Sequence, residues 1–229
     1  MSSALYKSPV LARWSQASSE DWLAYTNHAF IRGLADGTLP QACFHHYLIQ
    51  DYIFLVHFTR AWGMAVVKSD SLEEMRLSAT TVDALINVEM QLHIETCKKI
   101  GITEEQLYSA EEAFENLAYT RFVMDAGLSG DFLDLMAALA PCVFGYGVIG
   151  TSISKSAVAN TPYQDWIDTY AGEEYQGLCD VLGVMVQNAA LARLGPDLEK
   201  NPRWDALCKR FRTATRLEID FWEMGLRGQ

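Results

Sequence analysis

The sequence lacks the short motifs that mark the common metal and phosphate sites. It has no Walker A loop, no CxxC pair, and no ExxH pair of the kind that two helices of a dimetal carboxylate bundle each supply. Alternating polar and apolar runs bounded by turn residues are also missing, which argues against β-strands. We therefore expect an all-α fold with no metal and no cofactor.

Basic residues are few. Eighteen Lys and Arg stand against 29 Asp and Glu, for a net charge of -11, and such a charge repels phosphate backbones and anionic membranes. Nucleic acid and membranes are thus unlikely partners. The start of the chain shows no leader pattern, and the Pro, Gly, Cys and Ser content of the apolar stretch 136–153 suits a buried helix, so we expect a soluble, cytoplasmic protein.

The cysteines have neither the number nor the spacing of a disulfide framework. There are five, an odd count without close pairs, which favours free thiols in a reducing compartment. Most free cysteines behave as small buried apolar residues. We expect that of Cys43, Cys97, Cys179 and Cys208, and single out Cys142 because of its neighbours.

Half of the residues are hydrophobic, and the apolar positions recur at helical spacing with no linker between segments. We expect one domain over residues 1–229, a bundle of about seven or eight helices. The expected helices cover residues 19–36, 40–67, 72–99, about 109–127, about 131–149, 166–170, 173–194 and 202–225. Ser109 and Glu112 have capping-box spacing, which predicts a helix start there.

The stretch Leu139 to Tyr146 places a thiol and a phenol on one helix face, since Cys142 and Tyr146 are four residues apart. Pro141 inside the run removes a backbone donor and predicts a bend that aims Cys142 at a site. Gly145 and Gly147 allow close approach of another helix or of a ligand.

Two carboxylates fall on apolar helix stripes. Asp51 and Glu218 are each bracketed by large apolar residues, and Asp and Glu are almost never buried unpaired. Each is either a structural hydrogen-bonding group or a functional carboxylate, either protonated by burial or ionised by donors. Glu89 and His93, one turn apart, are better explained as a structural hydrogen-bonded pair than as metal ligands.

Eight segments, in this order along nearly the whole chain, resemble the signatures of one enzyme family. They are Asp36-Gly-Thr-Leu-Pro40, Leu48-Ile-Gln-Asp51, His57-Phe58, Glu89-Met-Gln-Leu-His93, Ala137-Ala-Leu-Ala-Pro-Cys142, Tyr163-Gln-Asp-Trp-Ile167, Thr169-Tyr-Ala-Gly172 and Glu218-Ile-Asp-Phe-Trp222. The family is TenA-type thiaminase II, an aminopyrimidine aminohydrolase, and the Pro-Cys-x-x-x-Tyr element resembles its cysteine-bearing branch.

The resemblance implies a haem-oxygenase-like helical bundle, usually a homotetramer. It implies hydrolysis of 4-amino-5-aminomethyl-2-methylpyrimidine to the hydroxymethyl compound and ammonia, as in thiamine salvage, with cleavage of thiamine as a related activity. By position, Cys142 is the nucleophile, Glu218 the proton carrier, and Asp51 an anion that binds the aminopyrimidine edge. The remaining pocket residues carried over are Tyr119, Tyr146 and Tyr170 for hydrogen bonding and Phe54 and Phe221 for stacking.

Two positions differ from the family pattern, and two alternatives stay open. Phe54 replaces a tyrosine of some relatives, and Gly145 and Gly147 replace bulkier residues, which predicts a wider pocket. One alternative is a haem- or quinone-related protein of the same helical superfamily, for which His28 would be the axial ligand. The other is a non-hydrolytic, pyrimidine-binding or purely structural helical module.

Overall fold

The computed structural model describes residues 5–228, which form helices without a β-strand in that range. Twelve α-helices are described, together with one π-helical turn and one 3-10 turn. The all-α class is confirmed. Contacts divide the chain into two compact units, which are taken separately below: unit 1 holds residues 1–39 and 136–219, and unit 2 holds residues 40–135 and 220–229.

Unit 1 is built from the N-terminal part of the chain, as far as Leu39, and from the helices that follow Leu135, as far as residue 219. Its helices are α1 (Pro9–Ala17), α2 (Ser19–Thr26), α3 (Ala29–Asp36), most of α9 (Phe132–Ile153), α10 (Gln164–Ala171), α11 (Glu173–Leu194), the 3-10 turn η2 (Leu198–Lys200) and α12 (Trp204–Leu226) as far as residue 219. α11 packs against α1 and α10. The predicted break at Gly172, between α10 and α11, is confirmed.

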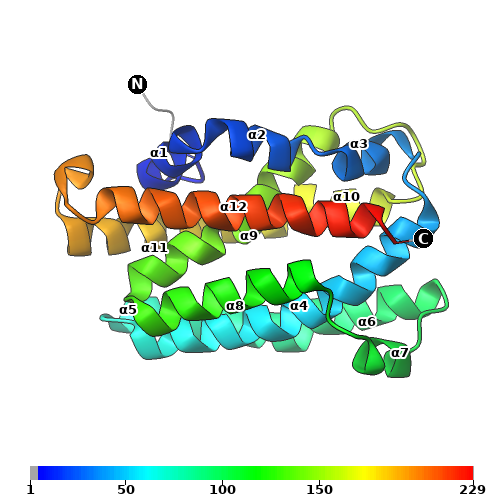
Figure 1. Cartoon of the computed structure of the whole chain (residues 1–229), viewed down its shortest axis with the longest axis horizontal. Coiled ribbons are helices and arrows are strands. Elements are labelled where there is room, and N and C mark those ends of the chain that lie inside the picture. Colours follow the sequence, from blue (N-terminus) through cyan, green and yellow to red (C-terminus); the bar gives the residue numbers. More distant parts are fainter. Residues whose placement is uncertain (1–4, 229) are drawn as a thin grey trace. The chain divides into compact units, whose positions relative to one another are not determined.

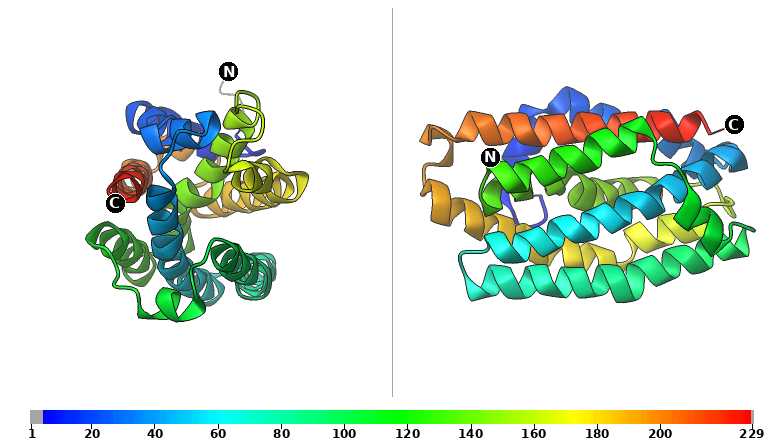
Figure 2. Two further views of the ribbon diagram at one scale, coloured as in Figure 1. Left: turned by 90° about the vertical axis from the view of Figure 1, so that its right-hand side faces the viewer. Right: turned by 60° about the horizontal axis from the view of Figure 1, so that its bottom comes forward.

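Unit 2 is organised around the long helix α4 (Gln41–Lys68). Along it lie α5 (Leu72–Ala84), the π-turn η1 (Leu85–Glu89), α6 (Met90–Lys99), α7 (Glu104–Ser109) and α8 (Phe114–Ser129) (Figures 1 and 2). Ser71 caps α5 by accepting the Glu74 N–H at 3.1 Å, as its capping-box spacing predicts. Pro40 is the N-cap of α4, directly before Gln41, and its fixed φ suits the entry into a helix.

The helices outnumber the seven or eight expected, because two predicted helices are broken and two short ones, α1 and α7, were missed. α1 has no counterpart in the prediction, and residues 19–36 form two helices because His28 caps α3, accepting the Phe30 N–H at Nδ1. The predicted cap at Ser109 is wrong. Ser109 ends α7 and donates back to the Glu105 carbonyl, while α8 begins at Phe114 without a side-chain cap.

The helix predicted over residues 72–99 is interrupted by the π-turn at 85–89. A π-turn inserts one residue and rotates the following face of the helix. The inward stripe therefore runs at four-residue spacing through Leu85, Glu89, His93 and Cys97. Val88 and Leu92, expected in the apolar core, are 50% and 56% exposed instead.

α9 is the apolar centre of unit 1 and continues as an α-helix through Pro141. By length and composition alone, α9 and α11 could each cross a membrane. However, 83% of the apolar window of α9 is buried, as in a core helix, against 44% for α11. Residues 145–150 also have GxGxxG spacing, but they lie within α9 rather than between a strand and a helix, so they lack the geometry of a dinucleotide loop.

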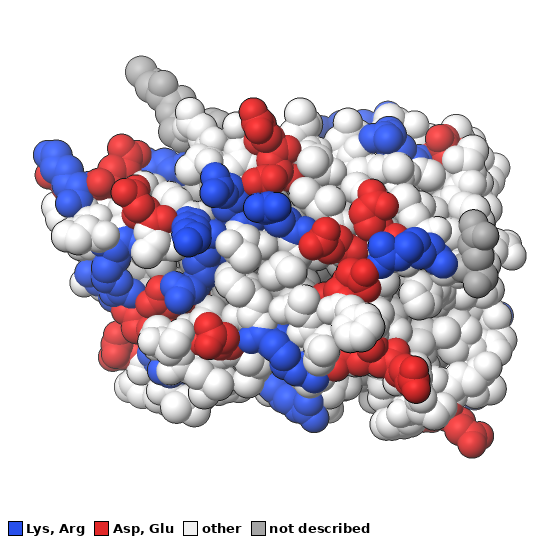
Figure 3. Space-filling view, viewed as in Figure 1, with Lys and Arg blue, Asp and Glu red and all other residues white. Residues whose placement is uncertain are grey.

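The charged side chains of the face shown in Figure 3 are of both signs. Lys and Arg lie among Asp and Glu there, and neither sign forms one continuous field. On that face the acidic side chains are dispersed among basic ones rather than gathered in one acidic patch.

Candidate functional site

Cys142 is the partly accessible residue of an otherwise buried stretch. Every other residue from 135 to 147 on α9 is buried, whereas Cys142 has intermediate exposure. A nucleophilic thiol must be reachable by its substrate. The position of this thiol on α9 therefore meets the first requirement for chemistry.

The other cysteines are placed differently. Cys43, Cys97 and Cys179 are buried, as predicted for small apolar residues, whereas the prediction is wrong for Cys208, which has intermediate exposure on α12. Burial raises the pKa of Cys97 and of Cys179 to about 12, and that of Cys208 to about 11. These three thiols remain protonated at neutral pH and are poor nucleophiles.

The backbone of α9 around Cys142 is held by side chains from other elements of unit 1. The hydroxyl of Tyr25 donates to the carbonyl of Pro141 at 3.3 Å, and that of Tyr175 donates to the carbonyl of Val143 at 3.0 Å. Gln176 donates to the carbonyl of Gly147 at 3.0 Å. Carbonyls on both sides of Cys142 thus have a second partner, which fixes the turn that carries the thiol.

Aromatic side chains occupy the space beside Gly145 and Gly147. A Cβ atom on Gly145 would overlap the ring of Tyr25, and one on Gly147 would overlap the hydroxyl of Tyr6. The predicted close approach of another element is confirmed at both glycines. The space that they leave is taken by tyrosine side chains of the same unit, so the expectation that they widen the pocket is wrong at these positions.

Tyr146 and Tyr170 lie together, as the resemblance implies for residues of one pocket. Their ring centroids are 4.9 Å apart in an edge-to-face arrangement. Trp166 completes the group, with its ring 4.6 Å from that of Tyr170. Gln176 also accepts from Tyr6 and donates to the carbonyl of Tyr170 at 2.7 Å, so it ties the end of α10 to α9.

Glu218 lies on α12 and is 1% exposed, so the predicted burial of this carboxylate is confirmed. It precedes Phe221 by three residues, which places the two side chains on neighbouring positions of one helix face. Burial of a carboxylate disfavours its ionised form unless donors surround it.

In unit 2, Phe54 is the centre of an aromatic group that contains two more of the residues predicted to line the pocket, Tyr119 and Phe221. Its ring centroid lies 5.1 Å from that of Tyr119 on α8 and 5.6 Å from that of Phe221 on α12. All three side chains are buried. The structure therefore brings together Phe54, Tyr119 and Phe221, three residues that are far apart in the sequence.

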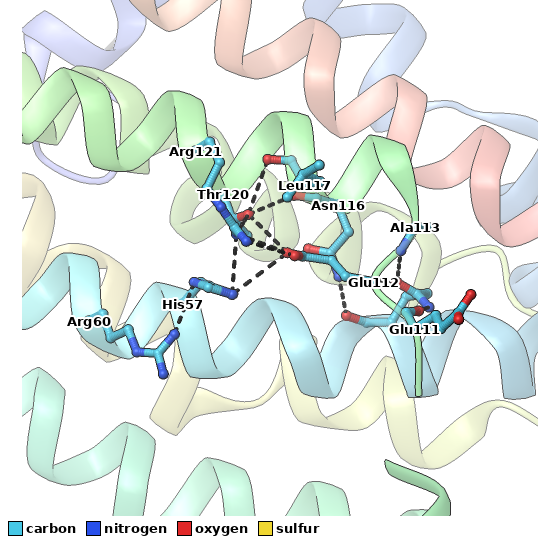
Figure 4. A network of polar contacts seen from close by, with 10 residues as sticks. His57, Arg60, Glu111, Glu112, Ala113, Asn116, Leu117, Thr120 and Arg121 are labelled. Carbon is cyan, nitrogen blue, oxygen red and sulfur yellow. Dashed lines mark hydrogen bonds and ion pairs between the residues drawn. The ribbon is translucent and has the colours of Figure 1, made fainter. Parts of the chain in front are cut away.

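A polar network fixes α8 against α4 beside this group (Figure 4). The amide of Gln50 donates to the carbonyl of Glu111 and accepts from the N–H of Ala113, both at 2.9 Å, and Asn116 donates to the carbonyl of Gln50 at 2.8 Å. Arg121 binds both carboxylate oxygens of Glu112, at 3.0 and 2.8 Å. Gln50 directly precedes Asp51, so the network holds the backbone of α4 next to Asp51.

Asp51 is buried on α4, with limited hydrogen bonding to its carboxyl group. The Tyr47 hydroxyl donates to Oδ2 at 3.5 Å, and His93 Nδ1 lies 3.6 Å from the same oxygen. Burial, together with the nearby charge of Glu89, raises the pKa of Asp51 to about 8. Both effects favour the protonated carboxyl at neutral pH, whereas the resemblance implies an anion at this position.

Glu89 and His93 face inward after the π-turn, in the same unit as Asp51. His93 is hydrogen-bonded to the carbonyl of Leu48 at 2.7 Å, which supports the structural role predicted for it. Burial raises the pKa of Glu89 to about 7. Among residues 5–228, no group of three His, Cys, Asp or Glu side chains has the arrangement of a metal site.

Sequence patterns did not identify the residues that brace α9, namely Tyr25, Tyr175 and Gln176, or the contact of His93 with Asp51. The glycines at 145 and 147 were the available signal for the first group, since a glycine in a buried helix often marks a close approach. A regular helix pattern gives no signal for the contact between His93 and Asp51, because that contact depends on the π-turn.

Comparison with known proteins decides the family. A profile of the TENA/THI-4/PQQC family matches residues 16–228. The chain belongs to this family. The resemblance to TenA proteins in the eight sequence segments is thereby confirmed.

Individual family members are similar over nearly their full length. A curated protein of Halalkalibacterium halodurans, named aminopyrimidine aminohydrolase, is 33% identical over 89% of this chain and 89% of its own. An uncharacterized protein of Haemophilus influenzae is 39% identical over 92% of this chain and 96% of its own. A crystal structure from Silicibacter sp. TM1040, described as a TenA family transcription regulator, is 51% identical and has a TM-score of 0.94, covering 96% of this chain and 97% of that one.

Proposed function

We propose that this family member hydrolyses 4-amino-5-aminomethyl-2-methylpyrimidine to 4-amino-5-hydroxymethyl-2-methylpyrimidine and ammonia, a reaction of thiamine salvage. The name of the Halalkalibacterium relative supports an aminopyrimidine aminohydrolase. The observation that carries the proposal is the accessible thiol of Cys142 in the buried stretch 135–147 of α9.

Cys142 acts as the nucleophile in this scheme. Direct displacement of the amine from the exocyclic methylene is slow, because ammonia is a poor leaving group. When the thiolate adds to the pyrimidine ring, the ring loses its aromaticity and its electrons expel the amine, leaving an exocyclic double bond. Water then adds to that methylene, its proton is lost, and departure of the thiolate restores the aromatic ring.

Glu218 moves the protons that these steps require. It donates a proton to the ring or to the leaving amine in the first half and takes one from the attacking water in the second. Its burial supports this assignment, since a buried carboxyl holds a proton near neutral pH more readily than an exposed one. Proton transfer of this kind contributes about 100- to 10,000-fold to the rate.

The remaining predicted residues bind the substrate. Asp51 contacts the edge formed by the 4-amino group and the adjacent ring nitrogen, and Phe54 and Phe221 stack on the ring. Tyr119, Tyr146 and Tyr170 supply hydroxyl groups that orient it. The aromatic groups around Phe54 in unit 2 and around Tyr170 in unit 1 support these roles.

The decisive assay compares ammonia release from the aminomethylpyrimidine with thiazole release from thiamine, using the same preparation of wild-type protein. We expect faster turnover of the aminomethylpyrimidine and slower cleavage of thiamine. Absence of turnover with both substrates would contradict the proposed function.

A non-catalytic pyrimidine-binding protein is the second candidate, favoured by the description of the Silicibacter relative as a transcription regulator. A ligand that binds the native state must stabilise it. If the hydroxymethylpyrimidine product raises the melting temperature but no ammonia is released from the substrate, the binding role is correct. Release of ammonia that depends on Cys142 would exclude it.

We also propose that the protein is a homotetramer in the cytoplasm. Five free thiols support a reducing compartment. Apolar side chains exposed on η1 and α6, and on α11, support association with further copies. They are Ile86, Val88 and Leu92 in the first group and Leu178, Val181, Val184 and Leu191 in the second. Light scattering of the wild-type protein should give four times the mass of one chain. Leu92→Glu should lower the measured mass. A wild-type mass equal to that of one chain would refute the proposal.

A further inference from the structure

Asp51 and His93 form a nearly enclosed pair in unit 2. Their side chains are only 9% and 8% exposed, and Asp51 Oδ2 lies 3.6 Å from His93 Nδ1. The two residues come from α4 and α6, and the π-turn at 85–89 sets the register that turns His93 inward. π-turns of this kind often occur at functional sites.

The hydrogen bond to Leu48 determines the tautomer of His93. Its Nε2 lies 2.7 Å from the Leu48 carbonyl oxygen, which can only accept, so Nε2 carries the hydrogen. In a neutral imidazole, Nδ1 is then a bare acceptor. That acceptor faces the carboxyl oxygen of Asp51.

Two acceptors without a proton between them would repel each other in a buried place. One proton between Nδ1 and Oδ2 removes the repulsion. Burial lowers the pKa of His93 and raises that of Asp51 to about 8, so this proton belongs to Asp51 at neutral pH. Tyr47 donates to the second lone pair of the same oxygen, at 3.5 Å.

The other titratable groups around the pair do not compete for this proton. Burial holds the pKa of Cys97 at about 12, and burial with the Tyr108 contact holds that of Tyr52, whose ring lies beside His93, at about 12. Both are therefore neutral at pH 7. Glu89 is the remaining acid, and its negative charge is one of the causes, after burial, of the raised pKa of Asp51.

We propose that His93 is a positioning residue: a small approach of the two side chains, whose Nδ1 and Oδ2 atoms are 3.6 Å apart, lets Nδ1 accept the O–H of a neutral Asp51 and keeps that proton in place until an aminopyrimidine binds. This rests on the proposed function in one respect, that Asp51 contacts the aminopyrimidine. The ligand edge consists of a ring nitrogen that accepts and an amino group that donates. A neutral carboxyl matches both, whereas a carboxylate offers only acceptors. On binding, the Asp51 O–H turns from Nδ1 to the ring nitrogen, and no proton is needed from solvent.

The test uses two variants of His93 that separate its two hydrogen bonds. His93→Gln retains an N–H that reaches Leu48 in place of Nε2, and its amide oxygen, one bond further from the backbone than Nδ1, does not occupy the Nδ1 position. His93→Leu removes both. We expect His93→Gln to keep the wild-type melting temperature, which makes it the informative variant if His93→Leu fails to fold.

The first measurement is the pH dependence of kcat/KM, which reports ionisations of the free enzyme. Loss of the acceptor at Nδ1 makes the protonated form of Asp51 less stable, so its pKa falls. The high-pH limb should move to lower pH by about 0.5 to 1 unit in His93→Gln, with little change on the low-pH side. A limb that stays in place, or that moves to higher pH, would overturn the proposal.

The second measurement does not depend on catalysis. Nitrogen chemical shifts of His93 in the empty protein, assigned by comparison with His93→Gln, should show a neutral ring with hydrogen on Nε2 from pH 6 to 7.5. The infrared carbonyl band of protonated carboxyls should be weaker in Asp51→Asn than in wild type, and the intensity that remains belongs to other buried acids such as Glu89 and Glu218. A doubly protonated His93 or an ionised Asp51 would overturn the proposal even if the protein proves to have no aminohydrolase activity.

Discussion

The stretch of α9 around Cys142 and the stretch of α4 around Asp51 are both largely buried, yet they present different chemistry. On α9 one thiol is reachable, and the surrounding backbone is braced by tyrosine and glutamine side chains. On α4 the carboxyl group is enclosed, and its environment changes its protonation.

In the proposed function these two stretches have different roles. The α9 group would supply the reactive atom on a fixed support, and the α4 group would supply a hydrogen-bonding pattern whose charge is set by burial. Substitutions at the first should therefore reduce the rate of reaction, and substitutions at the second should change binding and its dependence on pH. The predictions below test this distinction.

The largest effect is expected for Cys142→Ser. A serine hydroxyl is a much weaker nucleophile than a thiolate at neutral pH, so ammonia release should fall about 1,000-fold or more while the melting temperature stays the same. Cys208→Ser is the matched control, because Cys208 is the other cysteine of intermediate exposure, and it should retain activity. Near-normal turnover by Cys142→Ser would rule out the covalent route.

Glu218→Gln should have the next largest effect. The amide keeps the size of the side chain but cannot transfer the proton, so kcat should fall about 100- to 10,000-fold with a small change in KM. Glu223→Gln, on the exposed side of the same helix, serves as the control and should behave as wild type. A loss confined to KM would place Glu218 among the binding residues instead.

Asp51 variants distinguish a neutral from an ionised carboxyl. An amide, like a protonated carboxyl, offers one donor and one acceptor, so Asp51→Asn should bind the hydroxymethylpyrimidine within about tenfold of wild type. Asp51→Ala leaves the pyrimidine edge unpaired and should weaken binding about 100-fold. Calorimetric titration at pH 7 measures both. Equal losses in the two variants would show that a carboxylate is required.

The same substitution should change how stability depends on pH. The pKa of Asp51 in the folded protein, about 8, exceeds its ordinary value of 3.8, so the folded state binds the proton more tightly. The contribution of Asp51 to stability is then greatest below pH 4 and decreases as the pH rises from about 4 to about 8. Asp51→Asn should consequently be more stable than wild type at pH 8 by a few kcal/mol relative to their difference at pH 5.

The smallest effect concerns the support of α9. In Gly145→Ala the added methyl group would overlap the Tyr25 ring, which should destabilise the fold by about 1 to 3 kcal/mol and lower activity. Gly177→Ala is the control, because its added methyl meets no atom within 4 Å, and it should stabilise α11 by up to about 1 kcal/mol. Denaturant unfolding measures both. Equal stabilisation by the two substitutions would show that Tyr25 does not brace α9.

Periodicity and turn residues were enough to predict the all-α class, the long helix α4 and the break at Gly172. They failed where a local irregularity changes the register. The π-turn at 85–89 exposes Val88 and Leu92 and turns Glu89 and His93 inward, and a regular helix pattern contains no sign of it.

The sequence predicts which residues of the candidate site are buried, but not the contacts that depend on distant parts of the chain. Burial of Asp51 and Glu218 follows from the apolar residues around them in the sequence. The raised pKa of Asp51 does not follow from the sequence, because it depends on how deeply the carboxyl is buried and on the side chains that η1 and α6 bring near it. The filling of Gly145 by Tyr25 likewise depends on an element more than 100 residues away in the chain.

The most direct test of the central claim is labelling of Cys142. Intact protein is treated briefly with a thiol alkylating reagent, with and without the hydroxymethylpyrimidine, and the modified cysteine is identified by mass spectrometry alongside residual activity. We predict that Cys142 is modified first, that activity falls in proportion, and that the pyrimidine protects both. Preferential labelling of another cysteine, or full activity after modification of Cys142, would contradict its role as the nucleophile.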